Sequence, residues 1–221
     1  MEVENKTLKS ENPKTVSTSQ KSTESIKLFD KWSFSGVVVE DAGLQGYINI
    51  KPIIAPRTNG YYHNTAFYKT KVSILERLMN RMQVSGHKGK KHRISSGHNT
   101  GKGKKVATLM YEILEVLEKR TKENPIQVVV TAVENAAPRE EVITIERSGA
   151  RYAQAVDIAP QRRVDLVVRF ICQGAAHKAF NSGISFKDAL IAEIMDCYEI
   201  GDKSMAMSKK NEIEKMAASA K

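Results

Sequence analysis

Residues 123–175 decide the fold, and their sequence is ENPIQVVVTAVENAAPRE (123–140), EVITIERSG (141–149) and ARYAQAVDIAPQRRVDLVVRFICQGA (150–175). Asn124 and Pro125 are typical of a helix start, because asparagine can cap the first turn and proline is favoured at the first helical position. This helical pattern stops before Pro138. A second one follows Pro160 and carries apolar residues at three- and four-residue spacing. Helices are therefore predicted at both ends of the stretch.

A β-hairpin is predicted between these two helices. Strand-like segments at 142–145 and 152–156 flank Ser148-Gly149, a dipeptide typical of a tight turn. Polar residues dominate the middle of this segment. We therefore expect the hairpin to project from the body of the protein rather than to pack inside it.

Apolar residues elsewhere also recur with a helical period. They predict four more helices: Val72 to Met82 with a C-cap at Gly86, Val106 to Leu117, a helix that starts near Ser185 and is capped by its hydroxyl, and roughly Met207 to Ala218. The predicted fold class is mainly α, a bundle of about six helices with a protruding β-hairpin arm and an extended N-terminal segment.

The chain is predicted to have three parts. Residues 1–25 are rich in Lys, Glu, Ser and Thr and are expected to form a disordered tail. Residues 26–68 should form an extended N-terminal segment, with short strands or extended arms at 37–39 and 47–50. Residues 69–221 should form a helical domain with a basic loop at 87–105 and the hairpin arm at 140–158.

Composition excludes several classes of protein. No stretch approaches the roughly 18 uninterrupted apolar residues of a membrane span, and residues 1–26 lack the apolar core of a secretory signal. The two cysteines, Cys172 and Cys197, lie far apart in apolar helical patterns, as expected of buried thiols in a reducing compartment. We expect a cytosolic or nuclear protein with no membrane partner.

The positive charge is concentrated in one part of the chain. The formal net charge is +10, yet residues 1–68 hold 8 basic and 7 acidic side chains and residues 106–221 hold 16 and 17. Residues 69–105 hold 11 basic residues and a single acidic one, Glu76. An ordinary solvated surface mixes both signs, so this concentration indicates a surface for a polyanionic partner.

Residues 87–105, HKGKKHRISSGHNTGKGKK, are the most basic part of that segment. Lysine charges on a glycine-rich backbone suit docking on phosphates, although a solubilising loop is the alternative. The glycine spacing does not match a nucleotide-binding phosphate loop. His87, His92 and His98 lack a cysteine or carboxylate partner at ligand spacing, so no metal site is expected.

The basic residues between 139 and 169 are all arginines. Arginine binds phosphate in a bidentate manner and stacks on bases, so with Tyr152 and Gln154 the hairpin is a candidate RNA-binding arm. The alternative is that these arginines pair with nearby acidic residues, namely Glu140, Glu141, Glu146, Asp157 and Asp165. No nucleophile, acid–base pair or cofactor motif is apparent, so neither an enzyme nor a cofactor is expected.

Several stretches together resemble a known family, the universal small-subunit ribosomal protein numbered seven in bacteria and five in eukaryotes. The matching stretches are LFDKW (28–32), ILERLMNRM (74–82), GKK (89–91), the stretches 123–140 and 150–175 quoted above, and MSKKNEIEKMA (207–217). The extended segment at 28–50 is similar to the archaeal and eukaryotic forms. The resemblance covers most of the chain after residue 26, and residues 123–175 are its most specific part.

The resemblance implies a helical bundle with a hairpin arm in the head of the small subunit, bound to the 3′ major domain of the rRNA. It implies a place at the exit site, near mRNA and exit-site tRNA, beside other head and platform proteins. It further implies a cytosolic ribosome, with nucleolar assembly if the source is eukaryotic.

The resemblance also implies roles for individual residues. It implies rRNA binding by Lys69, Lys71, Arg77, Arg81, Lys88, Lys90, Lys91, Arg139, Arg162 and Arg163. It places Arg147, Gly149, Arg151 and Tyr152 near mRNA or tRNA. Beyond Lys91 the chain departs from the family pattern, so rRNA binding by Arg93, Lys102, Lys104 and Lys105 rests on charge alone.

Two other functions fit the same charge pattern. A helical bundle with a basic patch and an arm could be a DNA-binding regulator. However, the charge lies in a loop rather than on a recognition helix. An enzyme acting on nucleic acid would need a positioned acid, base or metal, and the sequence indicates none.

Overall fold

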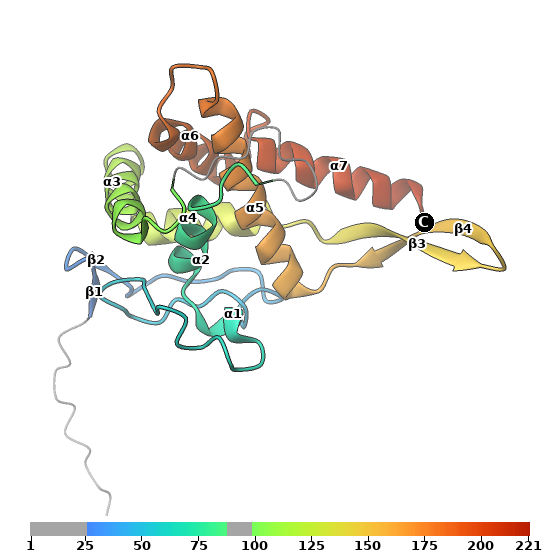
Figure 1. Ribbon diagram of the computed structural model, residues 1–221, viewed down its shortest axis with the longest axis horizontal. Coiled ribbons are helices and arrows are strands. Elements are labelled where there is room, and N and C mark those ends of the chain that lie inside the picture. The colour runs from blue at the N-terminus through green and yellow to red at the C-terminus, as the bar shows by residue number, and fades with distance from the viewer. Residues whose placement is uncertain (1–25, 88–98) are drawn as a thin grey trace, which may run out of the picture.

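The computed structural model describes residues 26–87 and 99–221, apart from the side chain of Arg147 (Figure 1). The helices are α1 (Tyr68–Lys71), α2 (Ile74–Met82), α3 (Gly103–Thr121), α4 (Pro125–Asn135), α5 (Pro160–Ala179), α6 (Phe186–Tyr198) and α7 (Met205–Ser219). The strands are β1 (Lys27–Leu28), β2 (Trp32–Ser33), β3 (Glu140–Arg147) and β4 (Ala150–Asp157). The fold is a helical body from which the β3–β4 hairpin projects.

Helix α5 is the element around which the body is packed. It contacts α2, α4, α6 and α7. Its residues Val164, Val167, Ile171 and Ala175 are almost fully buried, and their spacing of three and four residues places them on one face of the helix. The first turn begins at Pro160, as predicted. Burial of this face against four neighbours fixes where the two ends of α5 lie.

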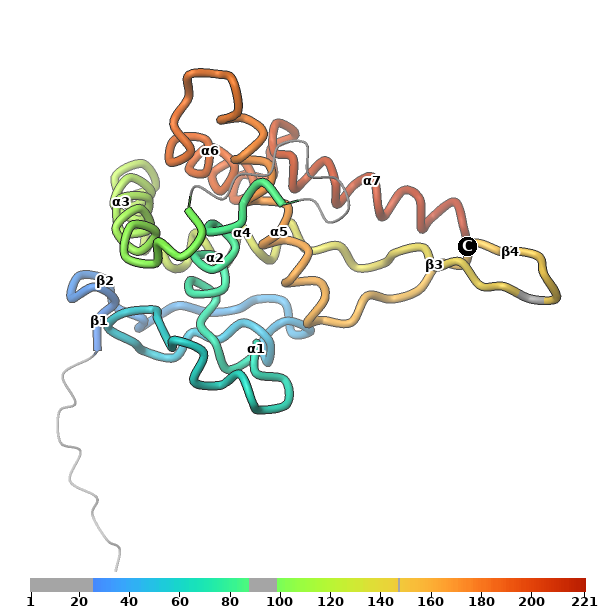
Figure 2. Tube along the Cα trace, in the orientation of Figure 1, coloured from blue at the N-terminus to red at the C-terminus, as the bar shows by residue number. Residues whose placement is uncertain are grey.

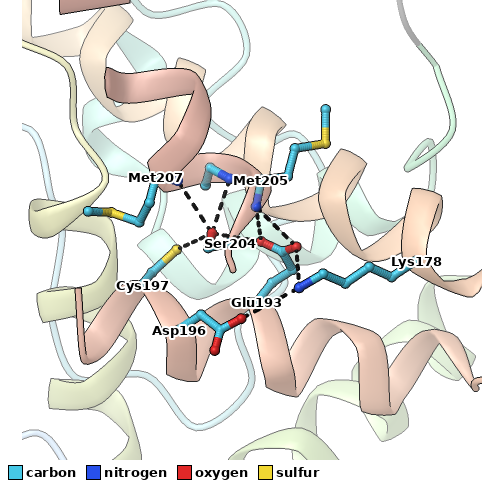
Figure 3. A network of polar contacts seen from close by, with 8 residues as sticks. Lys178, Glu193, Asp196, Cys197, Ser204, Met205 and Met207 are labelled. Atoms are coloured by element: carbon cyan, nitrogen blue, oxygen red, sulfur yellow. Dashed lines mark hydrogen bonds and ion pairs between the residues drawn. The ribbon is translucent and has the colours of Figure 1, made fainter. Parts of the chain in front are cut away.

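A buried carboxylate joins α5 to α6 and α7 (Figure 3). Glu193 on α6 has no exposed surface. It accepts hydrogen bonds from the Ser204 hydroxyl at 2.8 Å and from the Met205 amide at 3.1 Å, and pairs with Lys178 of α5 at 2.9 Å. Burial favours the neutral lysine, but the contact with Glu193 outweighs it and holds the pKa of Lys178 above its ordinary value. One side chain thus connects three helices.

The N-terminal segment passes beneath α4 and returns (Figure 2). Side chains of α4 and of its N-cap residue hold this segment by hydrogen bonds. Asn124 donates to the Ser33 carbonyl, and Glu134 accepts from the Asp41 amide. Gln127 accepts from the Val38 amide and donates to the Val38 carbonyl. The beginning and the end of this segment meet where the Phe29 amide donates a hydrogen bond to the Ile54 carbonyl at 2.8 Å. Apolar side chains from the segment join the main core, among them Leu28, Trp32, Phe34, Leu44 and Ile48.

The hairpin is antiparallel, with Glu140 opposite Asp157 and Arg147 opposite Ala150. Ser148 and Gly149 form its turn, and both have positive φ, 51° and 80°. That combination belongs to the tight turn that matches the strand twist, and glycine adopts it without strain. Helix α7 supports the base of the hairpin, where Glu214 accepts from the Arg139 amide and Lys221 pairs with Glu140 at 2.8 Å.

The predicted fold class is confirmed, with differences at element ends. The Asn124, Ser185 and Pro160 helix starts and the Ser148-Gly149 turn are confirmed. Helix α3 begins at Gly103, inside the predicted loop 87–105, and α2 ends at Met82, before the predicted cap at Gly86. Helix α7 begins two residues earlier than predicted, because Ser204 caps it, and the short α1 was not predicted.

Of the two alternatives predicted for 37–39 and 47–50, short strands or extended arms, the structure has no paired strands at these positions. The paired strands are β1 and β2, whereas 37–39 and 47–50 are held by side chains and by one isolated bridge between Asn49 and Ser73. The predicted tail at 1–25 lies outside the described residues. In the described ranges, no helix is both long and apolar enough to cross a bilayer.

Gly174→Ala is expected to destabilise the protein by about 1–3 kcal/mol, although alanine is favoured over glycine inside a helix by about 1 kcal/mol. The added methyl carbon would lie 2.8 Å from the Glu193 carboxylate, which its partners hold in place. Urea unfolding measures the difference. Gly46→Ala is the control, because the described residues leave open space there. A stabilised Gly174→Ala chain would contradict the explanation.

Candidate nucleic-acid interface

The structure separates the predicted basic residues by their surroundings. Exposed residues are Lys71, Lys102, Lys104, Lys105, Arg139, Arg151 and Arg162, together with Gly149 and Tyr152; Lys69 and Arg81 are half-buried; Arg77 and Arg163 are buried. Lys88, Lys90, Lys91 and Arg93, like His92 and His98, lie outside the described residues, and the side chain of Arg147 is not described.

Arg77 and Lys69 share one carboxylate. The Arg77 guanidinium on α2 donates to one oxygen of Asp165 on α5 at 2.9 Å and to the Tyr47 carbonyl at 3.2 Å. Lys69 donates to the other oxygen at 2.7 Å. Burial alone would raise the pKa of Asp165, but Lys69 and Arg77 outweigh it and hold that pKa below its ordinary value. Arg77 therefore joins α2, α5 and the N-terminal segment.

Arg163 also acts within the protein. Its Nε donates to the Pro138 carbonyl at 3.1 Å, and its Nη2 donates to Asp41 at 2.8 Å. Burial of Asp41 opposes ionisation, yet the hydrogen bonds from Arg163 and the Gly43 amide lower its pKa. This ion pair fastens the N-terminal segment to the first turn of α5. Neither Arg77 nor Arg163 has much of its guanidinium left for an external phosphate.

Arg81 lies where the chain leaves α2 for the most basic segment. Its Nη2 donates to the His87 carbonyl at 2.9 Å, and Gln173 on α5 donates to the same oxygen at 2.8 Å. Burial lowers the pKa of Arg81, and the nearby charge of Arg169 adds to this effect. The two bonds fix the point from which residue 88 departs.

The start of α3 carries positive charge that no acidic residue of its first turn offsets. Lys102, Lys104 and Lys105 are exposed, and the first turn of α3 has no acidic residue. The N-terminus of a helix is itself the positive end of its dipole, so lysines there are unfavourable without an anion. The guanidinium of Arg57 adds a further charge, 3.2 Å from where a Cβ of Gly103 would stand. This surface suits a polyanion.

Two arginines of the hairpin region pair with nearby acidic residues, which is one of the two alternatives raised by the sequence. Arg162 pairs with Glu141 at 2.8 Å, and Arg151 lies 3.6 Å from Glu146. Both arginines are still exposed, and such surface pairs are weak, so a phosphate can compete for them. Tyr152 is 58% exposed on β4, which leaves its ring accessible for stacking.

Two kinds of side chain that often serve in catalytic or metal sites are the metal ligands and the cysteine thiols. No group of three or more His, Cys, Asp or Glu there could hold a metal ion. Burial raises the pKa of Cys172 and that of Cys197 to about 12, so both thiols are poor nucleophiles.

The structure adds residues to the basic surface that sequence reasoning left out. Arg57 is brought to the start of α3, and Arg169 and Tyr68 line a hollow together with Lys69 and Arg81. Arg169 carried a signal as a member of the arginine-only run, and in the structure its side chain is exposed and lines the hollow beside the buried Val168. Arg57 and Tyr68 had no such signal, since irregular chain positions Arg57 and the short helix α1, which was not predicted, positions Tyr68.

The fold and this surface define a class: a small helical protein with a projecting hairpin and a surface of exposed lysines and arginines. Comparison with known proteins identifies the family. The family model described as ribosomal protein S7p/S5e matches residues 44–221. The chain belongs to this ribosomal protein family.

Curated relatives match over almost their whole length. Small ribosomal subunit protein uS7 of Nanoarchaeum equitans is 48% identical over 196 residues, which is 89% of this chain and 99% of the relative. The proteins of the same name from Methanosphaera stadtmanae and Methanothermobacter thermautotrophicus are 44% and 43% identical, over 89% and 87% of this chain and 99% and 98% of their own.

Asp165→Asn should destabilise the protein at neutral pH and remove part of its sensitivity to acid. We expect a loss of about 2 kcal/mol, below the ~3–5 kcal/mol of a fully buried pair because Asp165 is partly exposed. The pKa of Asp165 is lower in the folded protein than in the unfolded chain. Its contribution is therefore present above about pH 4 and is lost as the pH falls through the folded-state pKa.

Urea unfolding at several values between pH 7 and pH 3 measures this effect. The difference between Asp165→Asn and the unchanged chain should shrink as the pH falls. Asp202→Asn, at an exposed turn, is the matched control and should stay close to the unchanged chain throughout. A difference that is the same at both ends of the range would argue against the ion pair.

Proposed function

We propose that the chain is a structural constituent of the small ribosomal subunit, located in its head, where it binds the 3′ major domain of the rRNA and supports head assembly. The observation that carries the proposal is the excess positive charge at residues 69–105, where 11 basic residues face one acidic residue, Glu76. Glu76 is itself buried and accepts from Thr58, so it is not part of the exposed surface. Family membership supports RNA as the polyanion.

The residues that we assign to the rRNA surface differ in the observations that support each assignment. Lys69, Lys71, Arg81, Lys102, Lys104, Lys105, Arg139 and Arg162 have exposed or half-buried side chains. Lys88, Lys90, Lys91 and Arg93 are assigned on charge and resemblance alone. Arg77 and Arg163 contribute by holding the surface in shape, since their guanidiniums bind Asp165 and Asp41.

The hairpin is assigned to the exit site, near mRNA and exit-site tRNA. The arm projects from the body, and its tip carries Gly149, Arg151 and Tyr152 as exposed residues, with Arg147 beside them in sequence. An arm of this shape can reach a neighbouring strand of RNA while the body stays on the rRNA. Other small-subunit head and platform proteins are the expected protein partners.

The proposal assigns the protein to a cytosolic ribosome, with nucleolar assembly if the source is eukaryotic. It gives the protein no catalytic activity and no cofactor. The proposed organisation of the chain is a tail at 1–25, an extended segment at 26–68 and an rRNA-binding domain at 69–221.

Sedimentation of a cell lysate on a sucrose gradient tests the proposal. The protein should travel with small subunits and full ribosomes, and should remain with small subunits after magnesium is chelated. A protein that stays at the top of the gradient or follows chromatin would contradict the proposal. Competition separates the DNA-binding alternative, because structured RNA of the 3′ major domain should displace bound RNA far better than duplex DNA does.

Substitution of both Arg147 and Arg151 by alanine should leave folding intact and alter initiation accuracy or frame maintenance. Arg151 makes only the exposed contact with Glu146, so its loss costs the fold little. Reporters of start-codon choice and frameshifting in cells that carry only this variant provide the measurement. Arg120 and Lys203, exposed on the body, supply a double-alanine control. Unchanged reporters together with normal subunit levels would count against the role of the hairpin.

A further inference from the structure

A hollow of about 330 Å³ lies between α1, α2 and α5. Val72 and Val168, both buried, give it an apolar part, and Tyr68 lines it with 39% of its surface exposed. Phe67, the residue before Tyr68, is 79% exposed, so two aromatic rings stand at or next to this site. The volume is at the lower end of the range of small-molecule sites, about 300–1,000 Å³.

The charges that line the hollow do not balance. Among its described lining residues, four are cationic (Lys69, Arg77, Arg81 and Arg169) and Asp165 alone is acidic. Asp165 already binds both Lys69 and Arg77, so it has little left for Arg81 and Arg169. Arg81 and Arg169 line the same hollow, and the charge of Arg169 contributes to lowering the pKa of Arg81. Two cations that line one hollow and have no ion pair with any described carboxylate favour a bound anion.

Resting on the proposed rRNA-binding function, we propose that this hollow binds a single unpaired nucleotide of the RNA. The phosphate lies between Arg81 and Arg169, and the base lies over Tyr68 and the two valines. Sequence-specific RNA sites commonly take bases out of the stack and place them on aromatic side chains, while arginine binds the adjoining phosphate. The hollow has both parts within one site.

A carboxylate from an acidic protein neighbour would satisfy the two arginines equally well. It would leave the apolar part and the exposed surface of the Tyr68 ring uncovered, whereas a nucleotide covers both. Asn80, which also lines the hollow and is exposed, adds an amide that can bond the polar edge of a base. The combination of ring, amide and guanidinium therefore favours a nucleotide.

Binding of the full chain to a transcript of the 3′ major domain, measured at several salt concentrations, tests the proposal. Arg169→Gln should weaken binding about three- to tenfold and lower the slope of log affinity against log salt by roughly one. Tyr68→Leu should weaken binding at least about fivefold with little change in slope. Tyr68→Phe, which keeps the ring, should bind as the unchanged chain does.

Arg120→Gln removes the same charge from an exposed site on α3 and is the matched control for Arg169→Gln. Thermal unfolding of each variant shows whether it is folded.

If Arg169→Gln and Tyr68→Leu both bind like Arg120→Gln, the pocket proposal is overturned while the proposed function stands. If Arg169→Gln binds free RNA normally but is lost from assembled subunits, a protein carboxylate fills the hollow and the proposal is again overturned. If the unchanged chain does not bind the transcript, the proposed function itself fails.

Discussion

The carboxylate of Glu193 sets the packing of the C-terminal half of the protein. It has no exposed surface, so it must be satisfied from within, and three groups satisfy it: Lys178, the Ser204 hydroxyl and the Met205 amide. Gly174 is the residue that admits it, because a Cβ there would lie 2.8 Å from the carboxylate. An isolated buried charge is costly, so α5, α6 and α7 are stable only in the arrangement that brings all its partners together.

That arrangement fixes the direction of α7, and α7 fixes the hairpin. Lys210 on α7 donates to the Asn135 carbonyl at the end of α4, and Glu214 accepts from the Arg139 amide at the start of the hairpin. These contacts hold the base of an arm whose outer part lies away from the body. A two-stranded hairpin alone is marginally stable in water, so a supported base is what allows it to project in one direction.

Helix starts and turns that depend on a few neighbouring residues could be predicted from the sequence, whereas features that depend on contacts between distant residues could not. Asn124, Ser185 and Ser148-Gly149 act on backbone groups within three positions of themselves, so their effect is visible in sequence. The N-cap at Ser204 was not predicted, because the sequence of α7 has a weak apolar pattern. The bond between Ser204 and Glu193, which is distant in sequence, is visible only in the structure. The choice between strands and extended arms at 37–39 could not be made from the sequence for a related reason. Side chains of α4, not a partner strand, bond backbone groups of Val38 and Asp41, and which side chains face them depends on the whole fold.

The same limit applies to the basic residues, and here it bears on function. Nothing in the sequence separates Arg77 and Arg163 from Arg81 and Arg169. In the structure, Arg77 donates hydrogen bonds to Asp165 and Arg163 donates to Asp41. These internal pairs join the N-terminal segment, α2 and α5 beneath the surface that carries the exposed charges. The shape of that surface is therefore set before any partner arrives, which lowers the ordering cost of docking on a polyanion. A charged surface needs some of its cations for its own construction, and only the structure shows which ones remain for the partner.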